Sequence, residues 1–180
     1  SAYQQQTIIA EVSNNANRDC KATATFTIDV FDKSIPAITI TTLTSCDNTS
    51  FGTSTDGRVR FDLTQRASAI LNGQSASQFT ISYFQDAGFT IPIATPNNYV
   101  NTNSSETIYV KVVNTDNVNC VASTSFTIDV FPLPTITGVV TLKQCDDNID
   151  GYSAFNLTEA NSLISTNFSN ETFSYFETVT

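Results

Sequence analysis

Apolar and polar residues alternate along several short stretches of the chain. These stretches are AITITTLTSC (37–46), RVRFDL (58–63), FTISYF (79–84), TIYVKVV (107–113) and STSFTIDVF (123–131). Because successive side chains of a strand point to opposite faces, this period of two predicts half-buried β-strands. In the last stretch, Phe126, Ile128 and Val130 share one face, which we therefore expect to pack into a core.

One stretch has helical rather than strand spacing. It reads TQRASAIL from Thr64, and TEANSLI from Thr158 echoes it. Thr is a favoured N-cap, and Ala67, Ile70 and Leu71 fall at helical intervals. The pattern predicts a short helix of about two turns.

The chain also repeats itself. The letters FTIDVF occupy residues 26–31 and return at 126–131, and Asn14 and Cys20 are displaced by the same 100 positions to Asn114 and Cys120. A second pair, SCDNTSFGTSTDGRVRFDLT from Ser45 and QCDDNIDGYSAFNLT from Gln144, has an offset that falls from 99 to 94 because the first copy carries five extra residues. Since loops tolerate insertions far better than strands do, this is expected to be a structural repeat of roughly 100 residues.

A repeat of this length can bury its own core. We therefore assign residues 1–34 to the C-terminal part of one repeat, 35–134 to a complete repeat and 135–180 to the N-terminal part of the next. Residues 35–134 are called the central repeat below. Short strands with one short helix predict an all-β fold of tandem immunoglobulin-like or fibronectin-type β-sandwiches. The proline-bearing connectors DKSIP (32–36) and FPLP (131–134) are expected to be semi-rigid spacers.

Composition excludes several classes of function. The chain has 17 Asp and Glu against 8 Lys and Arg, whereas nucleic acids and anionic membranes require a basic face. No stretch reaches the roughly 18 apolar residues of a membrane-spanning helix, so we expect no direct membrane insertion. The chain has no His, which removes Ser/His/Asp and Cys/His catalysis and His-based zinc sites. The candidates for a catalytic pair of carboxylates are Asp29, Asp62, Asp86 and Asp129. We expect these side chains on solvated strand faces, so the chain is not expected to be an enzyme.

The four cysteines allow three connectivities. We favour a disulfide between Cys46 and Cys120, because both belong to the central repeat and closing the loop between them would stabilise it by about 4 kcal/mol. The alternatives are links across the connectors, Cys20 with Cys46 and Cys120 with Cys145, or reduced thiols. A disulfide would place the protein in an oxidising, extracellular compartment.

The stretch DDNIDG contains a candidate metal site. Asp146, Asn148 and Asp150 stand at alternate positions before Gly151, as in the first half of an EF-hand-type loop, and predict Ca²⁺ as a cofactor with a stiffening role. The twelfth position is Leu157 rather than Glu, so the site would be looser than an EF-hand. The alternative is a plain acidic turn, and the sister loop, residues 47–57, interrupts the pattern.

Aromatic residues on the predicted strands have two interpretations. Tyr83, Phe84 and Tyr99 could form a platform on which a sugar ring stacks, or they could belong to the core. Aromatic residues on alternating strands usually face a core, so we favour the second interpretation.

Several of these motifs resemble a known family. Cys46, the FDLT of 61–64, the YF strand at Tyr83, TIYVKV from Thr107, Cys120 and the strand from Phe126 occur in the same order in the tandem repeats of giant cell-surface adhesins of Bacteroidota. Those proteins are exported by the type IX secretion system and include the SprB-type gliding-motility adhesins. The resemblance covers the whole chain.

The resemblance implies an extracellular fibre or filament at the cell surface, acting in adhesion and gliding motility. The expected function is that of a structural and adhesive repeat module, a disulfide-locked, semi-rigid spacer. Its expected partners are neighbouring repeats, a surface polysaccharide, and outer-membrane motility or secretion machinery. The alternative is a carbohydrate- or protein-binding β-sandwich module of a secreted protein.

Overall fold

The structure of the chain is a computed structural model that describes residues 4–177. The chain divides into two compact units, Ser1–Phe131 and Pro132–Thr180. The strands of the first unit are β1 (Gln4–Ser13), β2 (Lys21–Val30), β3 (Leu43–Cys46), β4 (Arg60–Phe61), β5 (Phe79–Phe84), β6 (Tyr99–Val100), β7 (Ser105–Asn114) and β8 (Val121–Phe131). Its helical turns are η1 (Leu63–Arg66), α1 (Ala67–Leu71) and η2 (Pro96–Asn98), and those of the second unit are η3 (Leu157–Ala160), α2 (Asn161–Ile164) and η4 (Phe168–Asn170). Strands dominate, which confirms the all-β prediction.

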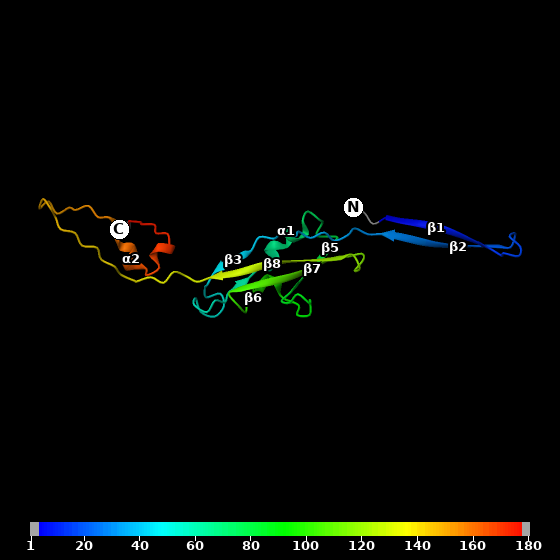
Figure 1. Ribbon diagram of the computed structural model, residues 1–180, viewed down its shortest axis with the longest axis horizontal. Helices are drawn as coiled ribbons and strands as arrows, with labels where there is room; N and C mark the ends of the chain where they lie inside the picture. Colours follow the sequence, from blue (N-terminus) through cyan, green and yellow to red (C-terminus); the bar gives the residue numbers. More distant parts are fainter. Residues whose placement is uncertain (1–3, 178–180) are drawn as a thin grey trace. The chain divides into compact units, whose positions relative to one another are not determined.

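The strands of the first unit form three sheets. A four-stranded sheet has the order β3-β8-β7-β5, a small sheet pairs β4 with β6, and β1 pairs with β2 in a separate hairpin. In the four-stranded sheet β3 runs parallel to β8, whereas β7 is antiparallel to both of its neighbours. Figure 1 shows β8 between β3 and β7. Within residues 4–177, no helix is long and apolar enough to cross a membrane.

Two of the predicted strands are much shorter than their alternating pattern. Only Leu43–Cys46 of residues 37–46 forms a strand, because side chains bind the backbone that precedes it: Thr124 Oγ1 donates to the Ala37 carbonyl at 2.6 Å, and Arg66 Nη2 to the Thr42 carbonyl at 2.9 Å. Similarly, only Arg60–Phe61 of residues 58–63 pairs with another strand. The strands predicted over 79–84, 107–113 and 123–131 are present.

The core lies between the four-stranded sheet and the segment around α1. Phe126, Ile128 and Val130 are buried, as their alternation predicts, and they belong to one apolar cluster with Leu63 and Ile70. The short helix is present, with a 3-10 turn at its start, and the same arrangement recurs over 157–164.

The start of the helical segment differs in one detail from the prediction. Thr64 is not the N-cap: Asp62 fills that role, because its side chain accepts the Thr64 N–H at 3.0 Å. Asn156 does the same for Thr158, at 3.2 Å.

The sequence repeat is also a repeat of local geometry. In β1–β2, Ile8 lies opposite Phe26, and in β7–β8 Ile108 lies opposite Phe126 with the same displacement of 100. The turns of the two hairpins match as well. Burial differs, since Phe26 is 51% exposed and Phe126 only 3%. The division of the chain at residues 34 and 134 stays a prediction.

Candidate functional site: the two ends of the central repeat

One end of the central repeat carries Cys46. It is the last residue of β3, and its Cα partner across the parallel ladder is Phe131, the last residue of β8. Asp47 continues this contact, because its N–H donates to the Phe131 carbonyl at 2.8 Å. The side chain of Cys46 is exposed. We call this the exit end, since the chain leaves β8 here.

A buried asparagine holds the loops of the exit end together. Asn101 is fully buried, and its amide Nδ2 donates to the carbonyls of Gly57 and Asn103 at 2.7 and 2.8 Å. Its Oδ1 accepts the Val59 N–H at 2.7 Å. Gly57 in turn donates its N–H to Asp47 Oδ2 at 2.7 Å, so a continuous set of hydrogen bonds leads from Asn101 to the residue after Cys46.

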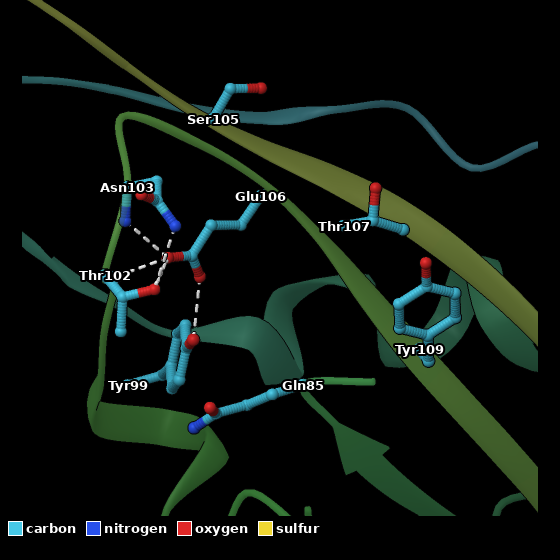
Figure 2. A pocket seen from close by; sticks show the side chains of 8 residues that line it. All are labelled: Gln85, Tyr99, Thr102, Asn103, Ser105, Glu106, Thr107 and Tyr109. Carbon is cyan, nitrogen blue, oxygen red and sulfur yellow. Dashed lines mark hydrogen bonds between the residues drawn. The ribbon is translucent and has the colours of Figure 1, made fainter. Parts of the chain in front are cut away.

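Glu106 fixes the neighbouring loop. Figure 2 shows its carboxylate turned toward the Tyr99 hydroxyl, which donates at 2.7 Å, and toward the N–H of Asn103, at 2.6 Å. Thr102 donates from both its N–H and its hydroxyl. Burial raises the pKa of Glu106, but the hydrogen bonds from Thr102 and Tyr99 outweigh it and hold the pKa below its ordinary value. Burial and the Glu106 carboxylate also raise the pKa of the Tyr99 phenol.

The hollow beside Glu106 has a volume of about 310 Å³. Its lining is mainly polar: Gln85, Tyr99, Thr102, Asn103, Ser105, Glu106, Thr107 and Tyr109. Glu106 is the sole carboxylate among these eight residues, and its oxygens already accept hydrogen bonds from the protein. General acid–base catalysis by paired carboxylates would need a second one at this hollow. Glu106 therefore acts as an anchor of the loop 101–104.

Replacing Glu106 with Gln is expected to lower the free energy of unfolding at pH 7 by about 1 kcal/mol, because Gln offers one acceptor oxygen to these donors instead of two. A lowered folded pKa gives stability that is present above the unfolded pKa, here the ordinary 4.5, and is lost as the pH falls through the folded value. The gap between wild type and Glu106→Gln should therefore shrink below about pH 4.5. Urea unfolding from pH 7 to pH 3 measures it.

Other carboxylates with lowered pKa values include Asp86, through the backbone N–H of Ile91, and Asp146, through that of Gly151. Both are present in wild type and in Glu106→Gln, so their contributions cancel in the difference between the two unfolding free energies. Glu159→Gln, on an exposed turn of the second unit, serves as the control. It should leave the dependence of the unfolding free energy on pH unchanged. A gap between wild type and Glu106→Gln that stays constant over the whole pH range would contradict the prediction.

The other end of the central repeat carries Cys120. This half-buried residue closes the turn between β7 and β8, where its carbonyl accepts the Asn114 N–H at 3.1 Å. The buried side chain of Asn114 accepts the Asp116 N–H at 2.9 Å and donates to the carbonyl of Asp32 at 3.0 Å. Ser34, also buried, donates its hydroxyl to the Val112 carbonyl at 2.8 Å. We call this the entry end, because residues 32–34 lead into the repeat here.

The structure places the two cysteines of the central repeat far apart. Cys46 lies beside the last residue of β8, whereas Cys120 immediately precedes the first. The 11 residues of β8 extend over about 36 Å, and two cysteines can be bridged only when their Cα atoms lie within about 7 Å. The predicted disulfide between Cys46 and Cys120 is therefore wrong, because β3 pairs with the last four residues of β8, at the end opposite Cys120.

The predicted calcium ligands do lie in one loop. Asn148 Nδ2 donates to Asp150 Oδ2 at 2.8 Å, and both oxygens of Asp146 accept backbone N–H groups, from Ile149 at 2.9 Å and Gly151 at 2.7 Å. These bonds close the loop as an acidic turn. In residues 4–177, no group of three or more His, Cys, Asp or Glu is placed to hold a metal ion. Calcium at Asp146, Asn148 and Asp150 stays a prediction.

The aromatic residues proposed as an alternative sugar platform belong largely to the core. Tyr83 and Tyr99 are only 5% and 6% exposed. Burial, reinforced by the charge of Asp62, raises the pKa of Tyr83 to about 12. Phe84 packs edge-on against Phe89, with a centroid separation of 5.4 Å. The core interpretation is therefore the better one for both tyrosines.

Comparison with known proteins gives a family for this region. A family model described as the Flavobacterium inter-domain disulphide bond domain matches residues 42–134, slightly more than half of the chain. The match begins just before β3 and ends just after β8, so it includes both Cys46 and Cys120. No curated protein and no solved structure matches the chain.

Proposed function

This chain belongs to the Flavobacterium inter-domain disulphide bond domain family, and on that premise we propose that it is a structural module of an extracellular protein whose neighbouring domains are joined by disulfide bonds. The observation that carries this proposal is the placement of the cysteines at the two ends of the central repeat. Cys46 is exposed and Cys120 half-buried, so each is accessible to a cysteine of another domain. Because disulfides persist in oxidising compartments, the proposal includes an extracellular location.

The larger protein in this proposal is a surface adhesin or filament of Bacteroidota, exported by type IX secretion and serving cell adhesion or gliding motility. Its support is the order of motifs that the chain shares with the repeats of such adhesins. The module contributes spacing and stiffness, and its direct partners are the neighbouring repeats. Surface polysaccharide and outer-membrane motility or secretion machinery are partners of the whole protein in this proposal.

The attachment of the connector supports the role of a semi-rigid spacer. Residues 32–35 are held to the entry end by more than their own backbone: Gln74 donates from Nε2 to the Lys33 carbonyl at 2.9 Å and accepts the Ile35 N–H at 2.7 Å. Asn114 and Ser34 add the bonds described above. A connector held at four points has little freedom to bend where it enters the repeat.

Strand order supports an immunoglobulin-like or fibronectin-type sandwich as the fold of each repeat. In such sandwiches the last two strands pair with a strand from the middle of the chain, and the second and fifth strands pair in the opposite sheet. Here β8, β7 and β5 are neighbours in one sheet, while β4 and β6 pair separately. The buried cluster contains residues from both sheets, including Phe61 of β4 and Val110 of β7.

We propose no enzymatic activity for this module. The chain has no His, and the carboxylate of the polar hollow, Glu106, is hydrogen-bonded to Tyr99, Thr102 and Asn103. The aromatic platform predicted for carbohydrate binding does not favour that role, because stacking on a sugar needs exposed rings and Tyr83 and Tyr99 are buried.

The proposal is tested on the native protein in intact cells. Free thiols are blocked with an alkylating reagent before lysis, and a brief protease treatment of the intact cells releases surface peptides for mass spectrometry. We expect peptides of this chain among those released, with Cys46 and Cys120 alkylated only after reduction. The proposal would be overturned if peptides of this chain were released only after lysis, or if both cysteines were alkylated without reduction.

A further inference from the structure

We infer that the inter-domain disulfide joins Cys46 of one repeat to the cysteine that takes the place of Cys120 in the repeat that follows it. This inference rests on the proposed function, which requires a disulfide between domains but leaves its two cysteines open. The positions of the two cysteines relative to the connector determine the pairing.

At the exit end, the cysteine lies one strand away from the last residue of β8. Cys46 is the Cα partner of Phe131, so the two backbones are separated by the spacing of neighbouring strands, about 4.8 Å. The Asp47 N–H binds the Phe131 carbonyl and prevents the strands from separating at this point. Phe131 is also the first residue of the next connector, FPLP, and Pro132 follows it directly.

At the entry end, one residue links the cysteine to the start of the connector. Asn114 donates from its side chain to the Asp32 carbonyl, while its backbone N–H binds the Cys120 carbonyl. One residue, Asn114, therefore touches both the connector and the cysteine. Asn114 is buried, which holds this arrangement in place.

The sequence repeat relates these two observations to a single junction. With the displacement of 100, Phe31 corresponds to Phe131 and Asp32 to Pro132. The exit cysteine of the preceding repeat therefore lies opposite Phe31, while Asn114 links Cys120 to Asp32. Because these two residues are consecutive, the exit cysteine of one repeat and the entry cysteine of the next are brought to the same junction.

Other pairings meet a geometric obstacle. Cys46 and Cys120 are separated by the length of β8, as shown above. The alternatives across the connectors, Cys20 with Cys46 and Cys120 with Cys145, each combine an entry cysteine with the exit cysteine of the repeat after it. In the proposed row of repeats joined by semi-rigid connectors, such a pair would have to reach across two repeats rather than one junction.

The bond forms by oxidation of the two thiols. Each Sγ–H loses its proton, the two sulfur atoms form one Sγ–Sγ bond, and two electrons pass to the disulfide of a thiol oxidant, which becomes two thiols. Outside the cytosol a disulfide-carrying oxidoreductase is the class of partner that supplies this oxidant, and oxidised glutathione supplies it in the test below.

The test uses the full chain, residues 1–180, followed by a second copy of residues 89–134. Tyr175 and Phe176 correspond to Tyr83 and Phe84, so this addition completes the last repeat and supplies a copy of Cys120 after the exit cysteine Cys46. The chain is refolded at low concentration with oxidised and reduced glutathione, its monomer is isolated and alkylated, and its disulfide-linked peptides are identified by mass spectrometry.

We expect one dominant linked pair, Cys46 with the added copy of Cys120. Cys46→Ser should abolish it and leave the added cysteine alkylated, whereas Cys120→Ser, the matched control at the original position, should leave the pair intact. A dominant link between Cys46 and Cys120, or between Cys120 and Cys145, would overturn the pairing and leave the disulfide-linked module standing. Absence of any disulfide from the folded monomer would count against the pairing and the proposed function together.

Discussion

Replacing Asn101 with Leu is expected to lower the free energy of unfolding of the first unit by about 3 kcal/mol. The substitution keeps the size of the side chain but removes three hydrogen bonds inside the protein, to Val59, Gly57 and Asn103. A buried backbone group that loses its partner costs about 1–3 kcal/mol, and burial of the new apolar side chain offsets only part of this sum. Equilibrium unfolding in urea measures the change.

The matched control is Asn103→Ala in the same loop. The Asn103 side chain is exposed and donates only to the Thr102 hydroxyl, at 3.2 Å, while its backbone bonds to Asn101 and Glu106 remain. We expect a change within about 0.5 kcal/mol. If Asn101→Leu were as mild as this control, the loops of the exit end would be held by contacts other than the asparagine.

Alternation predicts a strand well where the backbone N–H and carbonyl groups of that stretch bind the backbone of a neighbouring strand. Residues 79–84 form β5 as expected, and the apolar face of β8 is buried. Residues 37–42 alternate equally well but lie outside any strand, because Thr124 and Arg66 take the carbonyls that a neighbouring strand would have used. The pattern describes which side chains face the core and carries no information on which groups satisfy the backbone.

The position of the cysteines depends on strand register, which alternation does not specify. β3 pairs with the last four residues of β8, Leu43 opposite Ile128 and Cys46 opposite Phe131, so Cys46 lies at the end of β8 that is opposite Cys120. A shift of the pairing by two residues keeps every side chain on the same face, so the alternating pattern left this register open and the sequence favoured a pair that the fold separates.

The buried asparagines were also missed, although the sequence contains a signal for one of them. Asn114 repeats Asn14 at the displacement of 100, within a hairpin whose other matching positions are mostly apolar or threonine. A polar residue that recurs at a strand end indicates a hydrogen-bonding role there. Asn101 has no such signal, because its partners at Gly57 and Val59 are distant in the sequence.

Phe126→Ala is expected to cost about 3–5 kcal/mol, the largest effect of any substitution considered for this chain. Phe126 is 3% exposed and lies opposite Ile108 in the core, so its removal leaves a cavity among large apolar side chains. Its counterpart Phe26 lies opposite Ile8 in the same register but is 51% exposed. Phe26→Ala should therefore change the unfolding free energy of the first unit by less than about 1 kcal/mol. Urea unfolding of both variants gives the comparison.

The same two variants test the tandem-repeat proposal when the chain is lengthened. A copy of residues 35–100 placed before Ser1 would complete the first repeat, since Thr7 corresponds to Thr107. The front part of that repeat would supply the counterparts of Phe61, Leu63 and Ile70, which belong to the core cluster that contains Phe126. Phe26 should then become buried, and Phe26→Ala should become as costly as Phe126→Ala. A cost that stays below about 1 kcal/mol in the lengthened chain would show that β1 and β2 do not form the end of a folded repeat, because no second core would have closed over them.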